Sequence, residues 1–266
     1  HIYYSQTARG YSFIMFFSTL SIYATLKLLK SNKNLIWGLL LFLSGILSVY
    51  TVPLTAVFIL SLAVWILLVL TIPTLKVEFG LDQESVSRKF YQFLSIFILM
   101  GIGSVLLYWP HIDGLLQMLN EYYDESKVGS SNLGKNIYSS YLDKLIYFIP
   151  NLLTKIFPGL LIYFTPFILI GIFWNKTYCL AYRLLPVVIL LTTYLFTLIT
   201  GLAYYPRGYL FNLPLLLIFL VGGIMCTGEN LGNLIKQKTP INWMGYSLIG
   251  AYAVLALTEI FLNYYP

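Results

Sequence analysis

The chain has 266 residues, of which 59% are hydrophobic and only 10% are charged. Soluble domains carry about 25% charged residues, so this composition excludes an ordinary soluble domain and indicates an integral membrane protein. The formal net charge is +6, but the basic residues form small groups between apolar runs, which excludes nucleic acid as a partner.

Apolar runs of near-spanning length follow one another along the whole chain. Helices are expected, because a transmembrane barrel would show alternating strands of about ten residues. The predicted fold is therefore all-α, a polytopic transmembrane helix bundle of about eight spans in a single domain over 1–266. The predicted spans are 11–29, 35–51, 54–73, 90–109, 157–174, 184–202, 208–227 and 243–262.

Prolines mark the edges and interiors of several spans. Pro53 lies in the tight turn between the second and third spans, where proline ends one helix and begins the next. Pro166 and Pro214 fall inside predicted spans, so kinks are expected at both positions.

Loop charge predicts the orientation of the spans. The loops after the first, third, fifth and seventh spans hold most of the basic residues: Lys27, Lys30, Lys33, Lys76, Arg88, Lys89, Lys176, Arg183, Lys236 and Lys238. The positive-inside rule places these loops in the cytoplasm. We therefore expect a multi-pass protein of the cell membrane, with residue 1, the loop 110–156, the loop 203–207 and the C-terminus outside.

One outer loop and one cytoplasmic loop are predicted to have different structures. The outer loop 110–156 has helical apolar spacing in "HIDGLLQMLNEYYDES" and in "SSYLDKLIYFIPNLLTKIF", so two amphipathic helices are expected on the outer membrane surface. The cytoplasmic stretch "LKVEFGLDQESVSRKF" reads as a short connector. Cys179 and Cys226 lie near predicted cytoplasmic helix ends and are expected to be free thiols.

Two Arg-Gly-Tyr triplets lead into apolar runs at the outer side. Arg9 precedes Tyr11, and Arg207 precedes Tyr209. A guanidinium group at headgroup depth binds phosphate through two parallel hydrogen bonds, so these residues are candidate anion ligands. The alternative is that both arginines anchor their helices at the interface, with the tyrosines in an aromatic belt.

The first residues of the chain form a polar and aromatic cluster. Its members are His1, Tyr3, Tyr4, Gln6 and Tyr11. These side chains suit a sugar, which presents an apolar face and many hydroxyl groups, and an aromatic belt is the alternative.

Other polar residues carry weaker signals. His111 and Asp113 supply only two possible metal ligands, so no metal site is predicted, although a divalent metal stays open as a cofactor. Glu259 lies inside a span within a turn of its outer end, which favours an interfacial glutamate. The sequence lacks a phosphate-binding loop, a CxxC pair, a nucleophile elbow and an HExxH motif.

Two stretches resemble the membrane glycosyltransferases of the GT-C class, near the protein mannosyltransferases and the aminoarabinose-type lipid A transferases. In the first, a Ser-x-x-Ala-Arg-x-Tyr motif leads a helix, a basic loop follows, and a Trp-containing helix ends at a Tyr-Thr pair. Ser5, Ala8, Arg9, Tyr11, Trp37, Tyr50 and Thr51 fill these positions. The second is "YYPRGYLFNLP", similar to the family's Arg-Tyr helix with a following proline.

This chain departs from the family pattern at two positions. Val52 stands where many relatives have histidine, and Gly208 separates Arg207 from Tyr209. The family's catalytic carboxylate lies in an outer loop after its first helix. We expect that loop upstream of His1, in a longer chain, so no catalytic residue is named here.

The resemblance implies sugar transfer from a polyprenyl-phosphate donor to a lipid, protein or glycan acceptor on the outer face. It assigns Arg9 and Arg207 to the donor phosphate, with Tyr11 and Tyr209 as supporting donors, while Gln6 and His1 complete the substrate-binding set. Membrane lipids are further partners. The alternatives are a transporter or flippase for an anionic lipid-linked substrate, and a non-catalytic subunit of the same fold.

Overall fold

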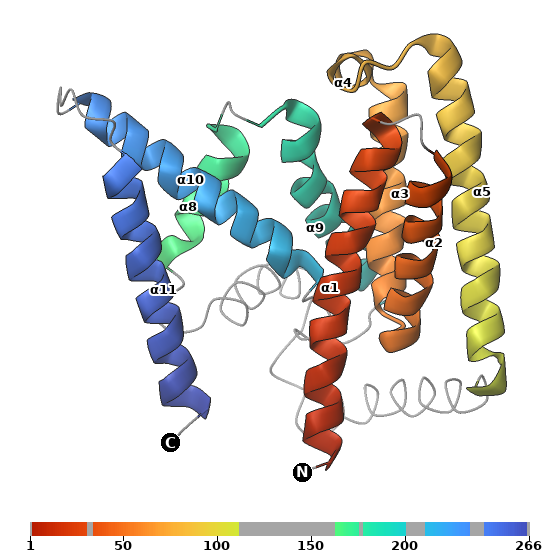
Figure 1. The fold of residues 1–266 in the computed structure, drawn as a ribbon, viewed down its shortest axis with the longest axis horizontal. Helices are drawn as coiled ribbons and strands as arrows, with labels where there is room; N and C mark the ends of the chain where they lie inside the picture. The colour runs from red at the N-terminus through yellow and green to blue at the C-terminus, as the bar shows by residue number, and fades with distance from the viewer. Residues whose placement is uncertain are drawn as a thin grey trace. The chain divides into compact units, whose positions relative to one another are not determined.

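The computed structural model describes residues 2–30, 34–111, 163–175, 178–200, 211–234 and 242–264 (Figure 1). Within these ranges the regular structure is helical, with nine α-helices and no strand, as the all-α prediction requires. The chain divides into two compact units. The first comprises His1–Phe148 and Val188–Phe211, and the second comprises Ile149–Val187 and Asn212–Pro266.

Two helices among the described residues are long and apolar enough to cross a membrane. They are the segment Ser12–Lys30 of α1 and the whole of α5, Gln83–Tyr108. Five further apolar segments of the described chain are shorter: Leu35–Thr51, Thr55–Thr71, Leu180–Phe196, Leu213–Gly228 and Gly245–Ala256.

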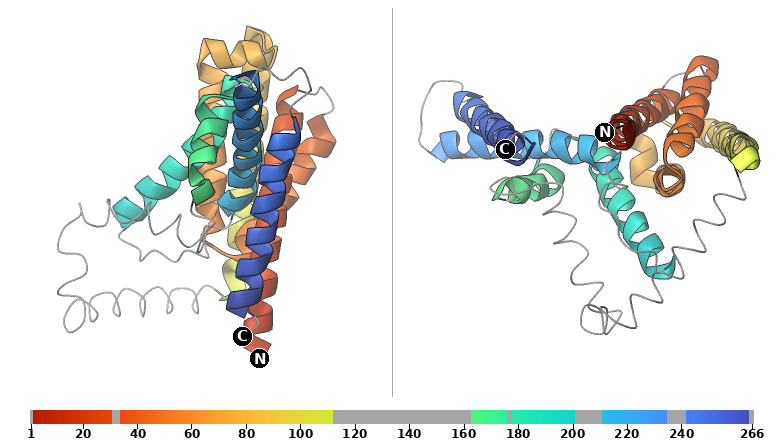
Figure 2. Two further views of the ribbon diagram at one scale, coloured as in Figure 1. Left: turned by 90° about the vertical axis from the view of Figure 1, so that its left-hand side faces the viewer. Right: turned by 90° about the horizontal axis from the view of Figure 1, so that it is seen from below.

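The first unit is built on four long helices that lie side by side: α1 (Ile2–Lys30), α2 (Asn34–Thr51), α3 (Thr55–Thr71) and α5 (Gln83–Tyr108). Helix α2 packs against both α1 and α5, and α3 contacts all three (Figure 2). Their shared core contains the fully buried side chains of Ile14, Leu28, Leu41, Phe58, Leu62 and Trp65.

Small hydroxyl residues line the contact between α1 and α2. The hydroxyl groups of Ser21 and Ser44 form a buried hydrogen bond of 2.8 Å across the two helices. Ser18 and Thr25 are also fully buried, at helical spacing from Ser21, and each bonds a carbonyl oxygen of its own helix. Small residues allow helix backbones to approach closely where no hydrophobic effect drives association, as in membrane interiors.

The segment predicted as a short connector after α3 is instead ordered helix and cap. Ile72 is extended (φ −79°, ψ 120°) and ends α3, and α4 (Pro73–Glu78) follows at once. Gly80 has φ 65°, a conformation that glycine adopts without strain, and Leu81 N–H donates to Lys76 O at 3.1 Å. This is the Schellman arrangement that closes a helix.

Asp82 then begins α5 as its N-cap. Its Oδ1 accepts a 2.9 Å hydrogen bond from Ser85 N–H, and Ser85 Oγ donates to Asp82 O at 2.9 Å. Because of this cap, α5 begins at Gln83, seven residues before the predicted span.

Several other predicted boundaries are wrong, because membrane hydropathy locates the apolar centre of a helix and not its ends. Helix α1 begins at Ile2, so Arg9 lies within the helix and not ahead of it. Helix α9 (Leu180–Thr200) starts earlier than predicted, and α10 (Leu213–Leu234) starts and ends later. Helices α2, α3 and α11 (Asn242–Tyr264) agree with prediction within about two residues.

The predicted proline kinks are also wrong. Pro166 lies in the first turn of α8 (Thr165–Phe173), and Pro214 is the second residue of α10. In a first helical turn the backbone N–H has no intrahelical acceptor, so proline costs no hydrogen bond there. Among the described residues, Pro186 is the proline that lies in the interior of a helix, α9.

The second unit centres on α10, which packs against α8 and α11. Gly171 of α8 and Gly223 of α10 lie where the two helix backbones touch. A Cβ atom on Gly223 would overlap Phe167 O, and one on Gly171 would overlap Phe219 O. Only glycine fits at this crossing.

Both cysteines belong to the second unit and neither forms a disulfide, as predicted. The predicted amphipathic helices of the loop 110–156 lie outside the described residues.

Candidate functional site

One end of the first unit is closed by an aromatic contact between α2 and α5. Tyr108 OH donates to Val49 O at 2.9 Å and to Tyr50 O at 3.0 Å. The rings of Tyr50 and Tyr108 lie 5.9 Å apart. The last four carbonyl groups of a helix lack intrahelical partners, so Tyr108 satisfies part of the end of α2. Trp109, 67% exposed, follows directly.

The opposite end of the unit is basic. Lys89 is 2% exposed, and its ammonium group donates a hydrogen bond to Leu28 O in the last turn of α1. A cation at a helix C-terminus satisfies a free carbonyl and interacts favourably with the helix dipole. Lys30 Nζ lies 5.8 Å from the centre of the Phe79 ring, which itself packs against Trp65.

The distance between these two ends matches a bilayer. Nineteen residues separate Lys89 from Tyr108 on α5, which at 1.5 Å per residue is about 29 Å. On α1, Arg9 precedes Lys27 by 18 residues and Lys30 by 21, or about 27 and 32 Å. The hydrocarbon core of a membrane is about 30 Å thick.

The six predicted substrate-binding residues divide into two groups. Gln6, Arg9 and Tyr11 lie in the N-terminal turns of α1, whose 29 residues exceed the 18 of α2 by about 16 Å of helix. These turns extend beyond the end of α2 (Figure 1). His1, Arg207 and Tyr209 lie outside the described residues, so the predicted convergence of the two arginines stays a prediction.

Asn175 begins a sequence motif of the N-glycosylation type, but its side chain takes part in helix packing. It opens the sequon Asn175-Lys176-Thr177, but it is 7% exposed, and its side-chain amide donates to Gly222 O of α10 at 3.1 Å. A buried amide bonded to a helix carbonyl holds the turn after α8 against α10. This residue is structural in the observed conformation.

The described residues contain no cluster of three or more histidine, cysteine, aspartate or glutamate side chains able to hold a metal ion. His111 ends a 3-10 turn, Trp109–His111, and its predicted companion Asp113 lies outside the described ranges. Glu259 belongs to α11.

Sequence analysis wrongly placed Lys89 in a loop and did not consider Tyr108, whereas both residues belong to α5. The available signal was the spacing from a basic pair, Arg88 and Lys89, to an aromatic pair, Tyr108 and Trp109, at the two ends of one apolar run. Comparison of the chain with protein-family models, with curated proteins and with solved structures gave no match.

Proposed function

We propose that this chain is a multi-pass membrane protein whose apolar helices cross the bilayer with the basic end of the first unit in the cytoplasm. The main support for this proposal is that the apolar helix α5 is mostly exposed. Its most apolar 18-residue segment has a mean hydropathy of 2.0, yet only 17% of that segment is buried. An apolar helix in the core of a soluble protein is mostly buried, whereas lipid solvates exposed apolar side chains.

The two ends of α5 support the same placement. Basic residues favour the cytoplasmic side, and tyrosine and tryptophan favour the interfaces. Arg88 and Lys89 lie at one end and Tyr108 and Trp109 at the other, separated by about the thickness of the hydrocarbon core. The lysines at the end of α1 belong to the same basic end.

Within this placement, the proposed activity is transfer of a sugar from a polyprenyl-phosphate donor to an acceptor on the outer face. Arg9 lies about 27–32 Å along α1 from the cytoplasmic lysines, which is the depth of the outer headgroups and of a lipid-linked phosphate. Its guanidinium group would neutralise charge that develops on the phosphate as the sugar departs. Arg207 would share this role, and Tyr11 and Tyr209 would add hydrogen bonds.

Cysteine labelling tests the orientation. In a variant with Cys179 and Cys226 replaced by serine, single cysteines at Ser130 and at Asn32 are exposed to a membrane-impermeant maleimide in intact cells. We expect labelling at Ser130 only, because Asn32 follows the lysines of α1. Labelling at Asn32 would reverse the orientation and remove the outer-face mechanism.

Donor binding tests the activity. Each charge-assisted hydrogen bond to phosphate contributes about 1.5–3 kcal/mol, so Arg9→Ala should weaken binding of a polyprenyl-phosphate sugar roughly 10- to 100-fold. Arg9→Lys keeps the charge but loses the paired geometry and should recover only part of this. Arg88→Ala, an exposed arginine at the opposite end, is the matched control. Donor binding without sugar transfer would instead favour the transporter or the non-catalytic subunit.

A further inference from the structure

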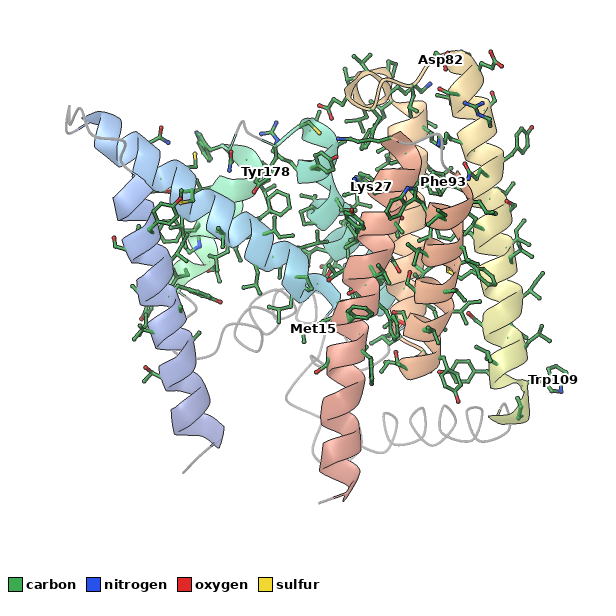
Figure 3. All side chains as sticks on the ribbon, viewed as in Figure 1. Met15, Lys27, Asp82, Phe93, Trp109 and Tyr178 are labelled. Carbon is green, nitrogen blue, oxygen red and sulfur yellow. The ribbon has the colours of Figure 1, made fainter. Side chains whose placement is uncertain are left out.

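A lysine near the C-terminal end of α1 is held by two aromatic rings. This residue is Lys27, which is labelled in Figure 3. Its Nζ atom lies 5.5 Å from the centre of the Tyr23 ring and 6.0 Å from that of the Trp37 ring. The two rings meet edge to face at 5.6 Å. Tyr23 and Lys27 lie one helical turn apart on α1, and Trp37 lies on α2, so packing of the two helices assembles the group.

The hydrogen-bond donors of this group are not used within the described part of the chain. Aromatic rings attract an ammonium group through their π-face, but they do not neutralise its charge. Lys27, Tyr23 and Trp37 make no hydrogen bond to another residue in the part of the chain that the structure describes. Lys27 and Tyr23 are exposed and Trp37 is half-buried, so the ammonium and hydroxyl groups are available to an anion with several oxygen atoms.

Exposed apolar side chains follow this group along α1. They are Phe16 and Phe13, which lie 11 and 14 residues before Lys27 and therefore on the same face of the helix. The 14 residues from Lys27 to Phe13 span about 21 Å, which exceeds the roughly 15 Å of one hydrocarbon leaflet. A molecule that fits both parts has an anionic phosphate at one end and long apolar chains at the other.

We propose that Tyr23, Lys27 and Trp37 form a binding site for the headgroup of an anionic phospholipid of the cytoplasmic leaflet, with its acyl chains along the exposed face of α1. The proposal rests on the membrane placement above, but not on sugar transfer. Two other basic side chains of this end have contacts of their own. Lys89 is buried and bonded to Leu28 O, and Lys30 lies over Phe79.

The test is lipid binding to the full chain in detergent, measured by native mass spectrometry. The probes are palmitoyl-oleoyl phosphatidylglycerol and the phosphatidylcholine with the same chains. We expect the protein to bind phosphatidylglycerol about tenfold more tightly, and Lys27→Gln to remove this preference while leaving phosphatidylcholine binding unchanged. Lys27→Arg keeps a charge that stacks on aromatic rings and should stay within about twofold of the unmodified protein.

Lys76→Gln is the matched control. Lys76 belongs to the same basic end, and no aromatic ring of the described residues lies against its ammonium group. Equal losses in Lys27→Gln and Lys76→Gln would show diffuse charge attraction and overturn the site, as would no loss in either. Glycerophosphoglycerol, the headgroup without acyl chains, should not displace the lipid at equal concentration. Displacement by it would identify a site for free phosphodiesters and overturn the lipid assignment.

Failure of this proposal can be distinguished from failure of the proposed function by two further measurements, one of membrane integration and one of sugar transfer. Resistance of the protein to alkaline carbonate extraction reports membrane integration, on which both depend. A chain that binds phosphatidylglycerol through Lys27 but transfers no sugar would retain the lipid site and lose the enzymatic assignment.

Discussion

The ammonium group of Lys89 on α5 donates a hydrogen bond to Leu28 O at the end of α1, although the two residues are 61 positions apart. Lys89 is almost fully buried, and Arg88 beside it is exposed. One basic residue of the pair therefore joins two helices, and the other faces outward.

We expect Lys89→Met to destabilise the first unit by about 1.5–3 kcal/mol, because it keeps an apolar side chain of similar length but leaves Leu28 O without its charged donor. Arg88→Met should change stability by less than about 0.5 kcal/mol. Urea unfolding of both variants in one detergent measures the difference. Equal stability of the two variants would contradict the structural role of Lys89.

Tyr108→Phe should cost about 0.5–1.5 kcal/mol, since it removes the hydroxyl that donates to Val49 O and Tyr50 O while the ring contact stays. Tyr50→Phe is the control on the other ring, because the carbonyl oxygen of Tyr50, and not its hydroxyl, takes part in this contact. Thermal unfolding in detergent should separate the two variants. A loss in Tyr50→Phe as large as that in Tyr108→Phe would argue against the end cap.

Gly223→Ala should disrupt the second unit at a cost of more than about 3 kcal/mol, because the added Cβ would overlap Phe167 O on α8 and the helix backbones must separate. Gly250→Ala on α11 is the matched control: its Cβ meets nothing within 4 Å, and alanine favours the helix by about 0.5–1 kcal/mol. The yield of folded protein and its melting temperature report both effects. A Gly223→Ala protein as stable as Gly250→Ala would refute the close crossing.

Hydrogen bonds from Ser85, first that of its side chain and then that of its backbone, hold the pKa of the Asp82 carboxyl below its usual value. A carboxyl with a lower pKa in the folded state stabilises the fold above its unfolded pKa of about 4, and this contribution is lost as the pH falls through the folded pKa. We expect the melting temperature to fall less steeply between pH 5 and pH 3 in Asp82→Asn, which keeps a capping oxygen but does not titrate. Parallel pH dependence in both proteins would contradict the cap.

Sequence alone determined that the described chain is all-helical, and it gave the approximate position of most of the described helices. Long apolar runs with few charges are sufficient for this, because a helix satisfies its own backbone hydrogen bonds wherever it lies. The ends of α1 and α5 were not predictable from hydropathy. They depend on the Asp82 cap, and on polar turns that continue a helix past its apolar centre.

Tertiary structure alone decided which residues act together. Ser21 and Ser44, Lys89 and Leu28, and Lys27 and Trp37 each meet across helices whose sequences carry no mark of the pairing. The rotation and register of packed helices are set by side-chain shape over the whole interface, which a one-dimensional pattern does not contain. The sequence therefore predicts helices that suit a membrane, and only their packing brings Lys27 close to two aromatic rings and buries Lys89.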